Sequence, residues 1–220
     1  MKILAITDVH GAYRTVEAIL ARAGKIDVFV IGGDFTVFGG PKEVEESVRS
    51  WGKFQVPMLA VSGNMDIPEV DRSLEKLGVS INGKGVVIEG VGFFGVSAAP
   101  YSPLHTPYEI SEEEIGRRIQ AGYEQVKGAG VKIFVPHAPP YKTKVDKISM
   151  GLHVGSKAVR EFIEREQPHV CICGHIHEAR GQDTIGHTKV VNCGPGKSGY
   201  YVLIDIEKII TIQNREYQRT

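Results

Sequence analysis

The sequence predicts an α/β fold in which two β-sheets pack face to face and helices cover their outer faces. Short β-rich runs alternate with helical patterns along most of the chain, which is typical of βαβ units and a mostly parallel sheet. Strand-like runs also occur at both ends of the 220 residues, which favours two sheets over one. The sequence contains no linker, repeat or low-complexity segment, so we expect residues 1–220 to form a single domain.

The first third of the chain contains three predicted strand–helix units. The apolar runs ILAI, VFVI and MLAV are predicted to be strands. Val16, Ile19 and Leu20 form the apolar face of the helix that follows the first strand. A second helix over residues 41–51 begins with proline in its first turn, where the missing N–H has no intrahelical partner to lose, and a third covers about 68–77.

The middle of the chain, residues 79–98, changes to closely spaced strands. The runs VSI, VVIE and GFFGVS are separated by glycines, which favours an antiparallel arrangement. Ser111 and Glu114 then form a capping box that predicts another helix. A last helix is expected over roughly 156–166, between the predicted strands KIFV and VCIC.

The tail has β character again and contains the glycine-rich segment GPGKSG. A phosphate-binding loop would need a further glycine five residues before Gly196, where Val191 stands, and a helix after the loop. The run YYVLIDI that follows is strand-like instead. We therefore expect GPGKSG to be a hairpin turn close to the functional site.

The composition is that of an ordinary globular protein, with 42% hydrophobic and 24% charged residues. The 26 basic and 26 acidic side chains balance, which argues against nucleic-acid binding because that requires clustered Lys and Arg. The first apolar stretch is too short for a signal-peptide core or a membrane span, so we expect a cytoplasmic protein with no membrane partner. Three cysteines without a CxxC pair indicate neither a disulfide framework nor a zinc ribbon.

Five of the predicted strands end directly before side chains that bind metal ions. These side chains are Asp8 and His10 after ILAI, Asp34 after VFVI, Asn64 after MLAV, His137 after KIFV, and His175 and His177 after VCIC. The carboxyl ends of neighbouring parallel strands meet at one edge of a sheet, where ligands collect. Each motif alone has an ordinary alternative, namely a helix N-cap, an Asx turn or a structural histidine. Their joint occurrence favours a metal site.

The motifs TDVH, GGD, GNMD, PHAPP and GHIH, in this order and at these intervals, resemble those of the calcineurin-like metallophosphoesterases. The likeness spans residues 8–177, and PPYKTKVDKISMGLHVGSKAVREFIE is similar to the same stretch of the Icc-related phosphoesterases of bacteria and archaea. The resemblance implies a four-layer αββα sandwich with a two-metal centre at the strand ends. It implies one metal bound by Asp8, His10, Asp34 and His177, and another bound by Asp34, Asn64, His137 and His175.

Such a centre predicts hydrolysis of a phosphoester. Two divalent ions about 3.5 to 4 Å apart can share a hydroxide, lower its pKa and hold the phosphoryl oxygens during in-line displacement. Carboxylate, amide and imidazole ligands without thiolate suit Mn, Fe, Co, Ni or Zn, among which we favour Mn. We expect His10, Asp34 and Asn64 to take part in catalysis on a small phosphoester, such as a cyclic or modified nucleotide.

One position departs from the family pattern. Many members of the family carry a histidine where this chain has Met65, and the resemblance assigns to that histidine contact with the phosphate and protonation of the leaving group. Its absence favours substrates whose leaving group needs little protonation, so we predict a phosphodiesterase rather than a phosphomonoesterase. His153, in a glycine-containing loop before a helix, is the candidate that supplies the missing proton, and the alternative is an ordinary surface histidine.

A non-catalytic protein on the same fold is the alternative function. A retromer subunit resembles these enzymes and uses its surface to hold partner proteins. Seven intact candidate ligands favour the enzyme, because a scaffold has no physical need for a complete two-metal site. Met65 is the single point in favour of the scaffold, and the sequence leaves the oligomeric state open.

Overall fold

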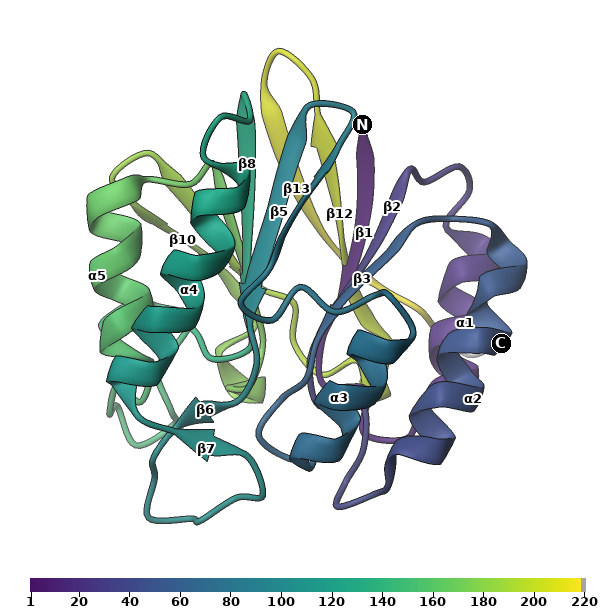
Figure 1. The fold of residues 1–220 in the computed structure, drawn as a ribbon, viewed down its shortest axis with the longest axis horizontal. Coiled ribbons are helices and arrows are strands. Elements are labelled where there is room, and N and C mark those ends of the chain that lie inside the picture. The colour runs from purple at the N-terminus through teal and green to yellow at the C-terminus, as the bar shows by residue number, and fades with distance from the viewer. Residues whose placement is uncertain (219–220) are drawn as a thin grey trace.

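The computed structural model describes residues 1–218 and contains two mixed β-sheets that pack face to face between two layers of helices (Figure 1). This arrangement confirms the predicted αββα sandwich. No helix in the described part of the chain is long and apolar enough to span a membrane.

The first sheet has five strands in the order β13-β12-β1-β2-β3. Their bounds are β1 (Lys2–Ile6), β2 (Val28–Gly32), β3 (Met58–Val61), β12 (Tyr200–Ile206) and β13 (Ile210–Glu216). The first three strands are parallel, while β12 pairs antiparallel with both β1 and β13. The late strands β12 and β13 therefore complete the sheet that begins with β1.

The second sheet has six strands in the order β10-β11-β9-β8-β5-β4. Their bounds are β4 (Gly85–Ile88), β5 (Val91–Val96), β8 (Val131–Pro136), β9 (Val170–Cys173), β10 (Gly181–Ile185) and β11 (Thr188–Asn192). The four central strands are parallel, and β4 and β10 pair antiparallel at the two edges. A short parallel pair, β6 (Ala99–Pro100) with β7 (Glu109–Ile110), lies outside both sheets.

The sequence VSI does not add the third antiparallel strand that its glycine-flanked pattern predicts. The hairpin of β4 and β5 is confirmed, but Ser80 forms an isolated parallel bridge with Ala60 of β3. The amide of Ile81 donates to the carbonyl of Ala60, and the amide of Ala60 donates to the carbonyl of Val79. The amide of Gly95 in β5 donates to the carbonyl of Ile81, and Asn82 forms a second parallel bridge with Gly95, so this segment links the edges of both sheets and forms no antiparallel strand of its own.

The five α-helices begin and end within one residue of the predicted bounds where bounds were predicted. They are α1 (Tyr13–Arg22), α2 (Pro41–Trp51), α3 (Pro68–Lys76), α4 (Glu112–Val126) and α5 (Lys157–Glu166). The hydroxyl of Ser111 accepts from the amide of Glu114 at 3.1 Å, so the predicted cap of α4 is present. The Glu114 carboxylate bonds to Arg117 and Arg118, the next turn of the same helix.

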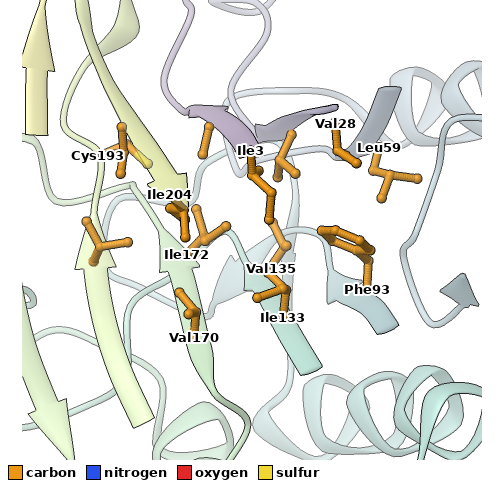
Figure 2. Close-up of a cluster of buried hydrophobic side chains, with 14 of the residues drawn as sticks. Ile3, Val28, Leu59, Phe93, Ile133, Val135, Val170, Ile172, Cys193 and Ile204 are labelled. Atoms are coloured by element: carbon orange, nitrogen blue, oxygen red, sulfur yellow. The ribbon is translucent and has the colours of Figure 1, made fainter. Parts of the chain in front are cut away.

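Three layers of buried apolar side chains hold these elements together. One lies between the two sheets, where Ile3 and Val28 of the first sheet face Phe93 and Val135 of the second (Figure 2). A second cluster joins the first sheet to α1, α2 and α3, and a third joins the second sheet to α4 and α5. Burial of this kind stabilises a fold by about 25 cal/mol per Å² of apolar surface removed from water.

The segment GPGKSG is a crossing between the sheets and not the predicted hairpin turn. It carries the short 3₁₀ helix η3 (Gly196–Ser198) between β11 in the second sheet and β12 in the first. A hairpin requires two strands that pair directly, whereas β12 pairs with β1 and β13. The predicted closeness to the strand ends is correct, because the amide of Lys197 donates to the carbonyl of Asp8 at 3.1 Å.

Candidate metal centre

The carboxyl ends of β1, β2, β3, β8 and β9 meet at one edge of the sandwich, the lower edge in Figure 1. Three of these strands belong to the first sheet and two to the second, so the site lies where both sheets end. The candidate ligands follow these strands within a few residues. They are Asp8, His10, Asp34, Asn64, His137, His175 and His177.

Four of these residues have a left-handed backbone, which is uncommon outside glycine. The φ angles are 55° at Asp8, 45° at His10, 53° at Asp34 and 67° at His175. Such conformations cost roughly 1–3 kcal/mol each and cluster at functional sites, where the surrounding structure holds them. The turn at each position directs a polar side chain towards the common edge.

One group of side chains gathers around His10. Its Nε2 atom lies 3.2 Å from Nε2 of His177 and 3.7 Å from Oδ2 of Asp34. His177 in turn places Nε2 3.3 Å from Oδ1 of Asp8. Ligand atoms of Asp8, His10 and His177 all lie within 4.8 Å of one another, a spacing compatible with one metal ion.

A second group gathers around the side-chain oxygen of Asn64. That oxygen lies 2.9 Å from Nε2 of His137 and 2.8 Å from Nδ1 of His175. His137 Nε2 also lies 3.5 Å from Oδ1 of Asp34. Asp34 therefore directs one carboxylate oxygen to each group, and all seven candidate ligands form one connected cluster.

The hydrogen bonding of His137 tests whether a cation fits here. Its Nδ1 lies 2.8 Å from the carbonyl of Gly32, which can only accept, so the ring proton is on Nδ1. Burial lowers the pKa of His137, so the ring is neutral and Nε2 carries a lone pair. That lone pair faces oxygens of Asn64 and Asp34, which are acceptors in this orientation. A cation among the three satisfies all of them.

The charges of the buried groups lead to the same conclusion. Burial, followed by the charges of Asp8 and Asp66, raises the pKa of Asp34 well above its usual range. Burial lowers the pKa of His10 to about 4 and that of His175 to about 3, so both rings offer lone pairs near neutral pH. Clustered carboxylates and neutral imidazoles are a suitable donor set for divalent transition metals.

Asp66 supports the cluster and was not among the residues predicted for the site. Its carboxylate accepts from the amides of Phe35 at 3.1 Å, Thr36 at 2.9 Å and Gly63 at 2.9 Å. These bonds fix the loops that carry Asp34 and Asn64. The available signal was the second polar residue of GNMD, two positions after the predicted ligand.

Asn192 supports the cluster from the other sheet. Its Nδ2 donates to the carbonyl of Ile176 at 2.9 Å and to that of Gly174 at 3.3 Å. These contacts hold the GHIH turn that carries His175 and His177. Gly174 itself is required by space, because a Cβ there would overlap the Asp8 carboxylate.

A cavity of about 1030 Å³ opens beside the cluster. His10, Asp34, Asn64, His175 and His177 line it, together with Met65 and Lys197, whereas Asp8 and His137 are fully buried. Met65 thus stands at the cavity wall. Lys197 is a cation at the site that the sequence did not single out, and its position after Gly196 in GPGKSG is the one feature that draws attention to it.

His153 also lines this cavity, and its side chain is 33% exposed. Its Nδ1 lies 2.7 Å from Oδ1 of the fully buried Asp146. Asp146 also accepts from the amides of Thr143 and Gly155, so the loop that carries His153 is closed around this carboxylate. His153 therefore lies at the cavity, and its role in proton transfer stays a prediction. Its contact with Asp146 is visible only in the structure.

Comparison with known proteins agrees with this geometry. The family model for calcineurin-like phosphoesterases matches residues 1–179. An uncharacterized protein of Methanocaldococcus jannaschii is 38% identical over 206 residues, which cover 92% of this chain and 91% of that protein. A UPF0046 protein of Caenorhabditis elegans is 27% identical over 223 residues, covering 90% and 71% of the two chains.

Two solved structures share the fold. A Thermus thermophilus protein superposes with a TM-score of 0.75 at 20% identity, covering 97% of this chain and 98% of the other. A dimetal phosphatase from Danio rerio gives a TM-score of 0.69 at 11% identity, covering 98% and 96%. At these identities the likeness shows the fold alone.

Proposed function

The chain belongs to the calcineurin-like phosphoesterase family, and on that premise we propose that it is a two-metal phosphodiesterase. A metal-dependent phosphoesterase follows from family membership and the clustered candidate ligands. The number of metals and the diester preference are our proposals. The proposal of two metals rests on Asp34, whose two carboxylate oxygens face different groups of candidate ligands.

We propose that Asp8, His10, Asp34 and His177 hold one ion, and that Asp34, Asn64, His137 and His175 hold the other. Manganese is our first choice, with iron, cobalt, nickel or zinc compatible with the same ligands. When bound, such ions lower the pKa of water and polarise phosphoryl oxygens. The Danio rerio protein of the same fold is a dimetal phosphatase, which supports two ions here.

The residues of the chain itself bind and orient the substrate. The ammonium group of Lys197 lies on the cavity wall, and its charge contributes to the lowered pKa of His10, so its field reaches the cluster. A phosphoester anion in the cavity is attracted by that charge. His10, Asp34 and Asn64 lie at the inner end of the cavity, next to the position of the reacting phosphorus in this proposal.

His153 is proposed to exchange a proton with the leaving group. Asp146 holds the ring through Nδ1 and leaves Nε2 free for this role. Met65, on the same cavity wall, has a thioether that cannot donate a proton. Because Met65 cannot serve as the general acid, a contribution worth about 10² to 10⁴ in rate depends on His153 alone, and leaving groups that need little protonation depend on it least. Aryl phosphodiesters are therefore the preferred test substrates.

A metal-replacement assay tests the proposal. The protein is stripped with a chelator, reloaded with single divalent ions, and assayed with bis(p-nitrophenyl) phosphate, p-nitrophenyl phosphate and an alkyl phosphomonoester. We expect turnover only with metal, and the highest kcat/KM for the diester. A clear preference for the alkyl monoester contradicts the diester assignment, and bound metal without any turnover favours the scaffold alternative.

Residues 1–220 are further proposed to form one domain of cytoplasmic location. The matched region ends at residue 179, and β12 and β13 beyond it complete the sheet that begins with β1. The proposed substrate is a small phosphoester molecule, and the balanced charge of the chain supports this over a nucleic acid.

A further inference from the structure

Exposed apolar side chains concentrate around the cavity. Most of the large hydrophobic residues that the described chain exposes lie in three loops that contribute residues to the cavity lining. They are Val37 and Phe38, Tyr101 and Leu104, and Met150, Leu152 and Val154. The remaining ones are Val86 and Val87 in the edge strand β4 and Ile209 in the turn between β12 and β13. Surface apolar residues gathered in one place indicate a binding surface, whereas scattered ones need no explanation.

Four of these side chains line the cavity itself. They are Val37, Tyr101, Leu104 and Val154. Pro100, Pro103, Ile148 and Ile176 line the cavity as well. The cavity therefore has the polar ligand cluster at its inner end and a mainly apolar wall towards its mouth. Its volume of about 1030 Å³ is far larger than a phosphate group requires, and it is at the upper end of ordinary ligand pockets.

Several polar side chains of the outer wall have hydrogen-bond partners within the protein. The hydroxyls of Ser102 and Thr106 both donate to the Glu109 carboxylate, each at 2.7 Å. Glu112 accepts from the hydroxyl of Ser156 at 2.6 Å and from the amide of Lys157 at 2.8 Å. These bonds hold the loops in place and occupy Ser102, Thr106, Glu109 and Glu112, so these four polar side chains are less available to a ligand than the apolar side chains beside them.

On the basis of the proposed function, we infer that the substrate is a phosphodiester that carries a long hydrocarbon chain on one of its ester oxygens. The diester phosphate lies at the ligand cluster with its charge near Lys197, and the chain lies along the wall formed by Val37, Tyr101 and Leu104. In the reaction, the oxygen of water bonds to phosphorus and the bond from phosphorus to the leaving oxygen breaks. One proton of the water goes to the leaving oxygen and the other to solvent.

A homologous series of substrates tests the inference. The manganese-loaded protein is assayed with methyl, butyl and octyl p-nitrophenyl phosphate, all below their critical micelle concentrations. Each methylene that becomes buried contributes about 0.8 kcal/mol, which is a factor of about 4. Partial burial still predicts that kcat/KM rises at least about tenfold from the methyl to the octyl ester. The leaving group is the same throughout, so the series reports on the chain alone.

Matched variants locate the effect. Val37→Ser and Leu104→Ser should each reduce the ratio of the kcat/KM for the octyl ester to that for the methyl ester severalfold. Val87→Ser and Ile209→Ser are the controls, since Val87 is 52% exposed against 54% for Val37, and Ile209 is 74% exposed against 81% for Leu104. The controls do not line the cavity and should retain the full chain-length dependence.

The outcomes separate the two proposals. Hydrolysis of all three esters at equal kcat/KM overturns the hydrocarbon inference and leaves the phosphodiesterase intact. A p-nitrophenyl ester of thymidine phosphate that reacts faster than the octyl ester also overturns it, in favour of a nucleotide. A rise that occurs only above the critical micelle concentration overturns it in favour of binding at a lipid surface. If no ester is hydrolysed, calorimetry compares the binding of methylphosphonate and octylphosphonate to the protein. Equal Kd values for the two compounds exclude the apolar site.

Discussion

Nε2 of His137 lies 2.9 Å from Oδ1 of Asn64, although the neighbouring carbonyl of Gly32 fixes the ring proton on the other nitrogen. Two acceptors that face each other in a buried place repel, and a cation between them turns that repulsion into binding energy. This pair explains why the geometry favours a metal centre over a structural histidine, which was the open alternative for His137.

Metal binding should therefore stabilise the fold measurably. A ligand present at about 100 times its Kd stabilises the native state by about 2.7 kcal/mol. For a chain of this length that corresponds to a rise of roughly 5 to 10 °C in Tm. Thermal unfolding of the stripped protein, with and without manganese, measures the shift. Asn64→Ala should reduce it, and an unchanged shift would separate Asn64 from the metal site.

Asp34→Asn should remove most of the activity. The neutral amide cannot serve both ligand groups as the carboxylate does, so we expect kcat/KM to fall by about 10² or more. Elemental analysis should find fewer metal ions per chain than in the wild type. Asp205→Asn, on a partly exposed aspartate of β12, is the control and should behave as wild type. Full metal content together with full activity in Asp34→Asn would exclude the bridging role.

His153→Ala should lose rate only on poor leaving groups. If the ring protonates the leaving oxygen, alkyl diesters should slow by about 10² to 10⁴, while p-nitrophenyl diesters should be nearly unaffected. The dependence of kcat on the pKa of the leaving group then becomes steeper. His105→Ala is the matched control, because His105 lies in a loop next to the cavity but does not line it. Equal losses on every substrate would indicate a structural role.

Asp66→Ala should destabilise the protein without altering a candidate ligand. The substitution leaves the amides of Phe35, Thr36 and Gly63 without their acceptor. Each buried unsatisfied donor costs about 1–3 kcal/mol, so the free energy of unfolding should fall by roughly 3 kcal/mol or more. Urea unfolding measures the free energy of unfolding. Asp183→Ala in the edge strand β10 provides the comparison, because Asp183 is partly exposed and accepts from the solvent-exposed amides of Lys144 and Thr184.

The loop of residues 101–109 should lose order in acid. Burial tends to raise the pKa of Glu109, but hydrogen bonds from Thr106 and Ser102 outweigh it and lower the pKa to about 2. A lowered pKa stabilises the folded loop above the ordinary value near 4.5, and this contribution is lost as the pH falls from there towards 2. Amide chemical shifts of Ser102 and Thr106 should follow this titration. In Glu109→Gln they should not change over the same range.

Local sequence patterns were sufficient to predict many of the helices and strands of this protein. The helix beginning at Pro41 and the cap at Ser111 are where the sequence predicts them, because caps and apolar periodicity act within a few residues. The candidate ligands were also found from the sequence, since each directly follows a recognisable strand. Prediction was wrong for VSI and GPGKSG, where the partner of the segment lies far away in the chain.

The amino-acid sequence by itself determined the order of the elements, the two-sheet class of fold and the seven polar residues at the strand ends. Only the tertiary structure decided that β12 pairs with β1, that Asp34 divides its oxygens between two groups, and that Asp146 holds His153. It also decided that loops from three parts of the chain bring their apolar side chains to one cavity. The physical reason is that strand pairing and side-chain convergence depend on contacts between distant segments, which local propensity does not encode.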